Sequence, residues 1–549
     1  MTHSSHGVDR GATDGIAPRA GRIGARAAAR HHGRRPLARV AAEVPDRVAL
    51  IEGIPSGGRR WTYAELLADA ERCANALLDH FEPGERFGVW AHNLPEWVIV
   101  EYGAALAGLT LVTLNPSLQP NEAAYVLRQS RSSGVLVVPE FRGNPIQAHA
   151  EAVQPDLPDL RHILRLDLLG ELMDATTPRA SLPDVAGDDP AQVQYTSGTT
   201  GFPKGVVLRH SGIVDNARLW ADRVEISDGA SWVSPMPLFH TGGCVLGVLG
   251  ALDKRATLTL MQAFEPGLFT ELIERERAEF AAGVPTMLIA AMEHPAFATR
   301  DLSAWKRVVS GGAQVPEALV RMIEQTLGVD FTIIYGQTEC SPTLTNTFPS
   351  DSPEDKGLTV GPALPHTEIR IVDPATLETV PIGEQGELWD RGYFTMIEYF
   401  DNPEATAETL LPDGWVRTGD LATMDDRGYC RIVGRLKDMI IRGGENLFPV
   451  EIEEVLMRHP AIAEVAVLGL PDDKWGEIVA GFLRLTDGAD APTVTELREF
   501  VRAELSPQKT PTRWFAVDGF PLTGSGKVQK YAIRTAWEQG EFDGAELSA

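Results

Sequence analysis

The stretch QYTSGTTGFPKGVVL, residues 194 to 208, places three glycines, several hydroxyl side chains and one lysine between two apolar flanks. Val193 and Tyr195 alternate with polar neighbours as at the end of a strand, and residues 206 to 208 are typical of the next strand. The segment between them is therefore predicted to be a loop between two strands. Glycines let such a loop expose consecutive N–H groups, while the hydroxyl groups and the lysine add donors. The loop is predicted to bind phosphate.

Two common nucleotide-binding motifs are excluded by the residues around this loop. A P-loop needs Ser or Thr directly after its lysine, at the start of a helix. Gly205 follows Lys204 instead, and Val528 follows Lys527 in the later stretch GSGKVQK. No G-x-G-x-x-G opens a helix after a strand in this region, so a dinucleotide-binding fold is excluded as well.

The composition is that of a globular protein with more than one domain. The chain has 549 residues, beyond the size at which one core stops growing, and its formal net charge of -26 argues against a nucleic-acid-binding surface. Residues 97 to 114 are the most apolar stretch, but they contain Glu101 and predict a buried helix and strand, with no membrane span. The four widely spaced cysteines predict neither disulfides nor a zinc site, and suit a cytoplasmic location.

Helical and strand-like segments alternate along most of the chain. Apolar positions recur at helical spacing over residues 63 to 78, and the strand-like run RFGVWA follows. This alternation predicts an α/β fold of helix-covered β-sheets, followed near the C-terminus by a small α+β unit. We expect a basic, disordered tail over residues 1–35, a large N-terminal domain over 36–436 and a small C-terminal domain over 437–549.

Six further motifs follow the glycine-rich loop in order: PLFHTGG at 237–243, SGGA at 310–313, YGQTE at 335–339, RTGDL at 417–421, GRLKDMIIRGGENLFPVEIE at 434–453 and PLTGSGK at 521–527. Together with S-G-T-T-G-x-P-K-G they resemble the adenylate-forming superfamily of acyl-CoA synthetases, luciferases and peptide-synthetase adenylation domains. The resemblance covers the chain from about residue 45 to about residue 535. It implies that ATP and Mg²⁺ activate a carboxylate to an acyl-adenylate, with release of pyrophosphate, before transfer of the acyl group to a thiol.

The resemblance also implies roles for residues in the large domain. The glycine-rich loop and Lys204 would hold the β- and γ-phosphates, Tyr335 would stack on adenine, Thr338 would reach a phosphate, and Asp420 and Arg435 would bind the ribose. Glu339 would hold magnesium, which accepts one carboxylate together with phosphates and water. The expected nucleotide-binding residues of the large domain are Thr196, Ser197, Gly198, Thr199, Thr200, Gly201, Lys204, Gly311, Gly312, Ala313, Tyr335, Gly336, Gln337, Thr338, Asp420 and Arg435.

The catalytic residues are expected to be Lys527 and His240. By resemblance, Lys527 bridges the carboxylate and the α-phosphate during adenylation, and a mobile small domain then rotates about a hinge at Lys437. This rotation would bring Gly443 and Gly444 beside the pantetheine arm of CoA and Glu445 toward His240, which would act as a gate near the substrate carboxylate. Some family members carry Asp at the hinge, so a lysine there is a departure. The small residues Thr241, Gly242 and Gly243 predict a roomy acyl pocket.

The expected function is an acyl-CoA synthetase for a non-amino carboxylic acid, with a medium-chain, long-chain or bulky apolar acid favoured. Adenylation domains for amino acids place an Asp in the segment that corresponds to FHTGG, and none stands there. An acyl-AMP ligase that serves a carrier protein, a light-emitting oxygenase and an inactive scaffold of the same fold are the alternatives. The expected binding partners are the acid, ATP and CoA, and no nucleic acid is expected to bind. The sequence leaves open whether the protein forms a homodimer.

Overall fold

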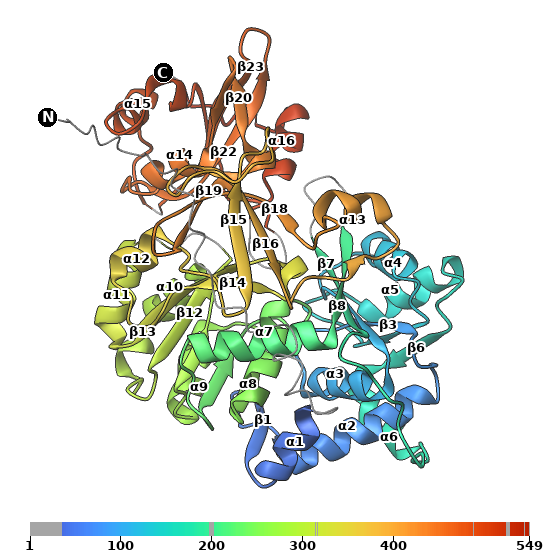
Figure 1. Ribbon diagram of the computed structural model, residues 1–549. Coiled ribbons are helices and arrows are strands. Elements are labelled where there is room, and N and C mark those ends of the chain that lie inside the picture. Colours follow the sequence, from blue (N-terminus) through green and yellow to red (C-terminus); the bar gives the residue numbers. More distant parts are fainter. Residues whose placement is uncertain are drawn as a thin grey trace, which may run out of the picture.

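The computed structural model describes residues 36–196, 203–312, 315, 317–486, 488–522, 528–542 and 544–547. Two large sheets form the body of the molecule and lie on either side of helix α7 (His210–Arg223), which contacts β7 and β8 of one sheet and β14 of the other (Figure 1). Their central strands are parallel, whereas β8, β17, β14 and β2 are antiparallel to their neighbours. This is the α/β architecture that the alternation of segments predicts.

The spatial order of the strands in the two large sheets differs from their order in the chain. From one edge to the other, the seven-stranded sheet consists of β17 (Glu398–Tyr399), β8 (Lys204–Arg209), β7 (Pro190–Thr196), β4 (Thr110–Leu114), β3 (Arg86–Trp90), β5 (Gly134–Val137) and β6 (His162–Arg165). The eight-stranded sheet consists of β14 (Thr343–Asn346), β13 (Asp330–Gly336), β12 (Arg307–Gly311), β11 (Phe280–Ala282), β9 (Ser231–Ser234), β10 (Thr257–Met261), β1 (Val48–Gly53) and β2 (Arg60–Thr62).

Two smaller sheets complete the fold and lie above the body in Figure 1. The four-stranded antiparallel sheet consists of β15 (Thr367–Val372), β16 (Gly386–Gly392), β18 (Val416–Met424) and β19 (Cys430–Arg435). The sheet of the small C-terminal domain consists of β21 (Glu445–Leu447), β20 (Ile440–Arg442), β23 (Gly476–Leu485) and β22 (Ile462–Asp472), with β24 (Arg513–Ala516) beside β23. The chain is therefore a mixed α/β protein with a large N-terminal and a smaller C-terminal domain.

The helices cover these sheets. Those of the large domain are α1 (Pro36–Glu43), α2 (Tyr63–Leu78), α3 (Pro95–Ala107), α4 (Pro120–Gln129), α5 (Ile146–Val153), α6 (Leu169–Asp174), α7, α8 (Gly250–Asp253), α9 (Pro266–Arg275), α10 (Pro285–Glu293), α11 (Glu317–Leu327), α12 (Pro353–Leu358) and α13 (Pro403–Thr409). Those of the small domain are α14 (Pro449–Leu456), α15 (Val494–Arg502) and α16 (Lys530–Glu538). A π-helix, η4 (Gly242–Leu249), runs directly into α8.

Local sequence signals explain where these helices begin and end. Helix α2 spans the predicted residues and begins with a capping box, in which Thr62 Oγ1 accepts a hydrogen bond from the backbone of Glu65 and the Glu65 carboxylate accepts one from the backbone of Thr62. Helix α3 begins with Pro95 and is followed by Gly108, whose φ of 66° suits glycine. The apolar stretch from 97 to 114 forms buried α3 and β4, as predicted.

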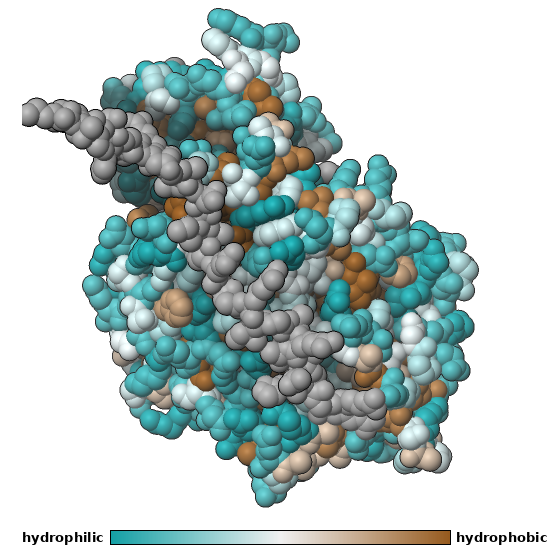
Figure 2. Space-filling model, in the orientation of Figure 1, coloured by the Kyte–Doolittle hydropathy of each residue, from teal (hydrophilic) through white to brown (hydrophobic). Residues whose placement is uncertain are grey.

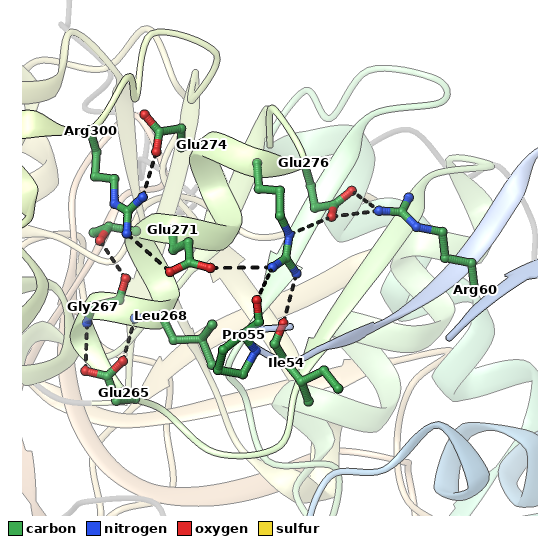
Figure 3. A network of polar contacts seen from close by, with 12 residues as sticks. Ile54, Pro55, Arg60, Glu265, Gly267, Leu268, Glu271, Glu274, Glu276 and Arg300 are labelled. Carbon is green, nitrogen blue, oxygen red and sulfur yellow. Dashed lines mark hydrogen bonds and ion pairs between the residues drawn. The ribbon is translucent and has the colours of Figure 1, made fainter. Parts of the chain in front are cut away.

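Hydrogen bonds and ion pairs tie α9 to the turn between β1 and β2 and to β2 itself (Figure 3). Arg275 donates to the carbonyl groups of Ile54 and Pro55, at 3.1 Å each, and its Nε donates to Glu276 at 3.2 Å. Arg60 on β2 donates to both carboxylate oxygens of Glu276, at 2.8 and 2.9 Å. Because the Glu276 side chain is largely buried and shared by two arginines, this network links the helix to the edge of the sheet.

Hydrophilic residues predominate on the face shown in Figure 2. No helix of the described residues is long and apolar enough to cross a membrane. All four cysteines are buried and free.

Candidate active site

The glycine-rich segment connects two antiparallel strands. Thr196 ends β7, Lys204 begins β8, and the two residues pair in register. The two strands predicted on either side of this segment are therefore confirmed. Five of the predicted phosphate ligands lie outside the described residues: Ser197, Gly198, Thr199, Thr200 and Gly201.

Lys204, Tyr399 and Glu339 lie together beside this hairpin. The Lys204 ammonium is 4.6 Å from the centre of the Tyr399 ring, and the Tyr399 hydroxyl donates to Glu339 Oε1 at 2.6 Å. Burial, and secondly the negative charge of Glu339, raise the pKa of Tyr399 well above its usual range. The tyrosine hydroxyl therefore stays protonated and can act as the donor. Tyr399 was not among the residues predicted from the sequence.

Glu339 fits the demands of a magnesium ion bound mainly by phosphate. It lies in the short helix η6 (Thr338–Cys340), within the loop between β13 and β14, and is 8% exposed. Its Oε1 accepts from Tyr399, whereas its Oε2 forms no hydrogen bond or ion pair within the described ranges. Magnesium in nucleotide sites takes one or two carboxylates and completes its shell with phosphate and water. No cluster of three or more potential protein ligands occurs in the part of the chain that the structure describes.

Tyr335, Asp420 and Arg435 converge although they lie far apart in the sequence. Tyr335 on β13 donates to Asp420 Oδ2 at 2.7 Å, and Arg435 Nε donates to Asp420 Oδ1 at 2.9 Å. Asp420 and Arg435 pair in register on β18 and β19, and Asp420 is 4% exposed. Burial first, and then the Asp420 carboxylate, raise the pKa of Tyr335 well above its usual range. The structure thus brings together the three residues predicted to bind the nucleoside.

Glu387 supports the turn that presents Asp420. Its buried carboxylate accepts from the backbone N–H of Gly419 at 3.1 Å, from Trp389 Nε1 at 2.8 Å and from Arg417 at 3.2 Å. Gly419 has a φ of 72°, a conformation that favours glycine. Glu387 was not predicted from the sequence; its signal is a glutamate within the otherwise apolar start of a strand, GELW.

The remaining predicted nucleotide residues lie at the ends of β12 and β13. These strands are parallel and Gly311 pairs with Ile334, so both carboxyl ends meet at one edge of the sheet, a usual place for ligands. A Cβ on Gly311 would lie 2.4 Å from the Ile334 carbonyl oxygen, and one on Gly336 would lie 2.0 Å from the Pro342 carbonyl oxygen. Gly312 has a φ of 76°, and Ala313 lies outside the described residues. Gly311 and Gly336 therefore serve close backbone packing, and Gly312 adopts a left-handed backbone conformation that favours glycine.

Gln337 and Thr338 follow directly in the loop after β13. Gln337 Nε2 is buried and has no hydrogen-bond partner among the described residues. Thr338 begins η6. An unpaired buried amide is costly, so a ligand acceptor near Gln337 would stabilise this loop.

His240 lies after β9, on the same sheet edge, because β9, β11, β12 and β13 are all parallel. The backbone N–H of Gly242 donates to its Nδ1 at 3.1 Å, which assigns the proton of a neutral ring to Nε2. Gly243 does not support the predicted roomy pocket, which stays a prediction. A Cβ there would lie 2.2 Å from the Pro237 carbonyl oxygen, so this glycine is small because two backbone segments touch.

The predicted residues of the small domain begin in its connection to the four-stranded sheet and continue into the β20–β21 hairpin. Lys437 is exposed in η7 (Leu436–Asp438), between β19 and β20. Gly443 and Gly444 form the two-residue turn between β20 and β21, with φ values of 60° and 88°. Such a hairpin turn requires positive φ at both positions, which accounts for both glycines apart from any ligand. Lys527 lies outside the described residues.

Glu445 begins β21 and is exposed. Its side chain makes no hydrogen bond or ion pair with any other described residue. The orienting contact with His240 is therefore not formed in this arrangement of the two domains and stays a prediction.

Comparisons with known proteins match both the large and the small domain to one family of enzymes. The AMP-binding enzyme family matches residues 37–400, and the AMP-binding enzyme C-terminal domain matches residues 451–527. The Bacillus subtilis (strain 168) protein YngI is 37% identical over 529 residues, 91% of this chain and 96% of its own. The Homo sapiens mitochondrial medium-chain acyl-CoA ligase ACSF2 is 35% identical over 92% of this chain and 87% of its own.

Solved structures show the same fold at lower identity. ATP-bound MatB from Rhodopseudomonas palustris superimposes with a TM-score of 0.84 at 27% identity, over 92% of this chain and 99% of its own. The o-succinylbenzoate CoA synthetase MenE from Bacillus subtilis, in complex with its acyl-adenylate, gives a TM-score of 0.81 at 28% identity, over 91% and 98% of the two chains. Because the family match alone covers well over half of the sequence, this chain belongs to the AMP-binding enzyme family.

Proposed function

We propose that this protein is an AMP-forming carboxylic acid–CoA ligase. The observation that carries the proposal is the hydrogen-bonded set of Tyr335, Asp420 and Arg435, which lies beside Lys204, Tyr399 and Glu339 at the junction of three sheets. A phenol, a carboxylate and a guanidinium at one edge can bind a nucleoside, while the lysine and the glycine-rich loop can hold phosphates. The reaction joins a carboxylate to AMP, releases pyrophosphate and passes the acyl group to CoA.

The large domain binds ATP so that its α-phosphate can be attacked. Asp420 would accept from the ribose hydroxyls, and the Tyr335 ring would face the adenine. Thr196, Lys204 and the loop between them would hold the phosphates that leave as pyrophosphate. Donors at this position stabilise the charge that develops as the bond to the leaving group breaks. Magnesium, held by Glu339 and phosphate oxygens, would supply further neutralisation of charge.

The small domain would supply the remaining groups. Lys527 would bridge the substrate carboxylate and the α-phosphate in the first step, because a flexible ammonium can be delivered and withdrawn. Rotation about Lys437 would then remove Lys527 and bring the hairpin of Gly443, Gly444 and Glu445 to the adenylate. The CoA thiolate attacks the acyl carbonyl carbon there, and AMP leaves. His240 would border the entry of the acid.

A medium-chain acid is the proposed substrate class. The name of the ACSF2 relatives states medium-chain acyl-CoA ligase activity, and they match most of this chain at 35 to 37% identity. No aspartate occurs in FHTGG, so the pairing partner of an amino acid is missing from this segment. The buried free cysteines suit a reducing compartment such as the cytoplasm.

Pyrophosphate release by the full chain, with ATP and magnesium and with or without CoA, tests the proposal across short-, medium- and long-chain and aromatic acids. We expect medium-chain acids to give CoA-dependent turnover and a thioester product. Acyl-AMP that accumulates without a thioester would instead favour transfer to a carrier protein. The absence of pyrophosphate release with every acid would contradict the enzymatic function.

Lys527→Ala separates the two half-reactions. It should lower adenylation by about 10²- to 10³-fold, the scale for loss of one oriented electrostatic donor. Thioester formation from supplied acyl-AMP should be retained, as measured by product chromatography. Equal loss of both half-reactions would contradict rotation of the small domain.

A further inference from the structure

Tyr399 lies between two opposite charges of the proposed phosphate site. Its ring faces the ammonium of Lys204, with 4.6 Å between the nitrogen and the ring centre, and its hydroxyl donates to Glu339 Oε1 at 2.6 Å. The side chain is buried, with 5% of its surface exposed. One residue therefore contacts both the predicted phosphate ligand and the predicted magnesium ligand.

Lys204 and Glu339 form no ion pair with each other or with another side chain of the described residues, although each contacts Tyr399. A buried carboxylate and a nearby ammonium attract strongly where the dielectric is low. If they paired, the lysine would lose part of its charge toward phosphate and the glutamate part of its charge toward a cation. Ligand binding would then first have to break that pair.

The backbone around Tyr399 fixes this position. Tyr399 pairs with Val206 on β8, and the N–H of Phe400 donates to the Gly205 carbonyl oxygen at 2.7 Å. Three residues before Tyr399, the N–H of Met396 donates to the carbonyl oxygen of Glu339 at 2.9 Å. The segment 396–400 is thus bonded both to the strand that begins with Lys204 and to the loop that carries Glu339.

We propose that Tyr399 is a positioning residue that acts as a neutral spacer between Lys204 and Glu339. Its ring stabilises the ammonium through a cation–π contact, and its hydroxyl stabilises the carboxylate through a hydrogen bond. Both charges are thereby held apart and stay available, one for the phosphates of ATP and one for the accompanying cation. This inference rests on the proposed function, because it takes Lys204 and Glu339 as ligands of ATP and magnesium.

Two substitutions separate the contributions of the ring and the hydroxyl. Tyr399→Phe keeps the ring but removes the hydrogen bond to Glu339, whereas Tyr399→Leu removes both. Tyr429→Phe is the matched control, since Tyr429 also donates to a carboxylate, Asp351 Oδ1, at 2.8 Å, but lies outside this site. Glu339→Gln reports on the proposed magnesium ligand itself.

Calorimetric titration of the full chain with ATP, in magnesium and in EDTA, and with AMP, provides readouts that do not depend on turnover. Tyr399→Phe should raise the Kd for ATP about three- to ten-fold in magnesium, the scale of one lost hydrogen bond, and change it less than about two-fold in EDTA. Tyr399→Leu should raise it under both conditions. AMP lacks the outer phosphates, so its Kd should be unchanged in both variants, which also shows that they are folded. Tyr429→Phe should match the wild type throughout.

The outcomes distinguish failure of the spacer from failure of the proposed site. If Glu339→Gln weakens binding only in magnesium while Tyr399→Phe leaves every Kd unchanged, the spacer role is overturned and the magnesium site stands. Equal weakening of ATP and AMP by Tyr399→Phe would indicate a general structural role and would also overturn it. If the Kd of the wild type for ATP is the same in magnesium and in EDTA, the proposed magnesium site is overturned, and the proposed spacer role of Tyr399 is overturned as well.

Discussion

Asp420→Asn tests the nucleoside site most directly. In the structure Asp420 accepts one hydrogen bond at each carboxylate oxygen, from Tyr335 at 2.7 Å and from Arg435 at 2.9 Å. An asparagine can accept only one of them, because its amide nitrogen would face the other donor. The substitution therefore removes one hydrogen bond to a charged group and leaves a donor facing a donor, within nearly the same volume.

The expected cost follows from these contacts. A hydrogen bond to a charged group contributes about 1.5–3 kcal/mol, and the Arg435 ion pair adds about 1 kcal/mol at most because the arginine side chain is half exposed. If the ribose hydroxyls bind the same carboxylate, the Kd for AMP should rise about ten- to hundred-fold. The free energy of unfolding should fall by on the order of 2 kcal/mol.

Calorimetric titration with AMP and urea unfolding of the same preparation measure both effects. Asp390→Asn is the control, since Asp390 is also a buried aspartate of the four-stranded sheet. Within the described ranges its carboxyl group hydrogen-bonds only with the Cys340 thiol, at 3.5 Å. Its AMP affinity should equal that of the wild type. An Asp420→Asn protein that is folded and binds AMP within two-fold of the wild type would refute the assignment of this carboxylate to the nucleoside.

Three further predictions follow from particular residues. Burial raises the pKa of Asp390 to about 8, so the folded protein keeps a proton that the unfolded chain releases near about pH 4, and stability should fall as the pH rises between these values. The Asp390→Asn variant lacks this pH-dependent loss of stability, so its melting temperature should exceed that of the wild type by more at pH 8 than at pH 5. An equal difference at both pH values would contradict the raised pKa of Asp390. Gly243→Ala should lower stability by several kcal/mol and reduce activity on acids of every length, because its Cβ would overlap the Pro237 carbonyl group. A stable variant with an altered chain-length preference would contradict this and would support the pocket hypothesis. Gly444→Ala should lower the free energy of unfolding by about 1–2 kcal/mol, the cost of placing an alanine in the left-handed conformation. Gly443→Ala should lower it by more, because its Cβ would also lie 2.8 Å from the Trp475 ring. Urea unfolding that ranks the two variants in the opposite order would contradict this account of the turn.

The sequence by itself determined the class of fold and the family. Hydrophobic periodicity identified α2 and the strands that flank the glycine-rich loop, because these elements depend on local pattern and capping. The ordered motifs identified Tyr335, Glu339, Asp420 and Arg435 as candidates, since each motif keeps its residue types together in the chain.

Only the tertiary structure decided which of these residues meet and what holds them. Tyr399 and Glu387 act through contacts with residues 60 and 32 positions away, Glu339 and Gly419, and no local pattern encodes such contacts. The tertiary structure likewise explains why glycine occupies particular positions. Gly243 lies against another backbone segment and Gly443 lies in a turn with positive φ, whereas the sequence alone offered room for the acid or for CoA as the explanation. Distances between segments that are remote in the chain arise from how the sheets pair and pack, so the sequence named the site residues and the fold brought them together.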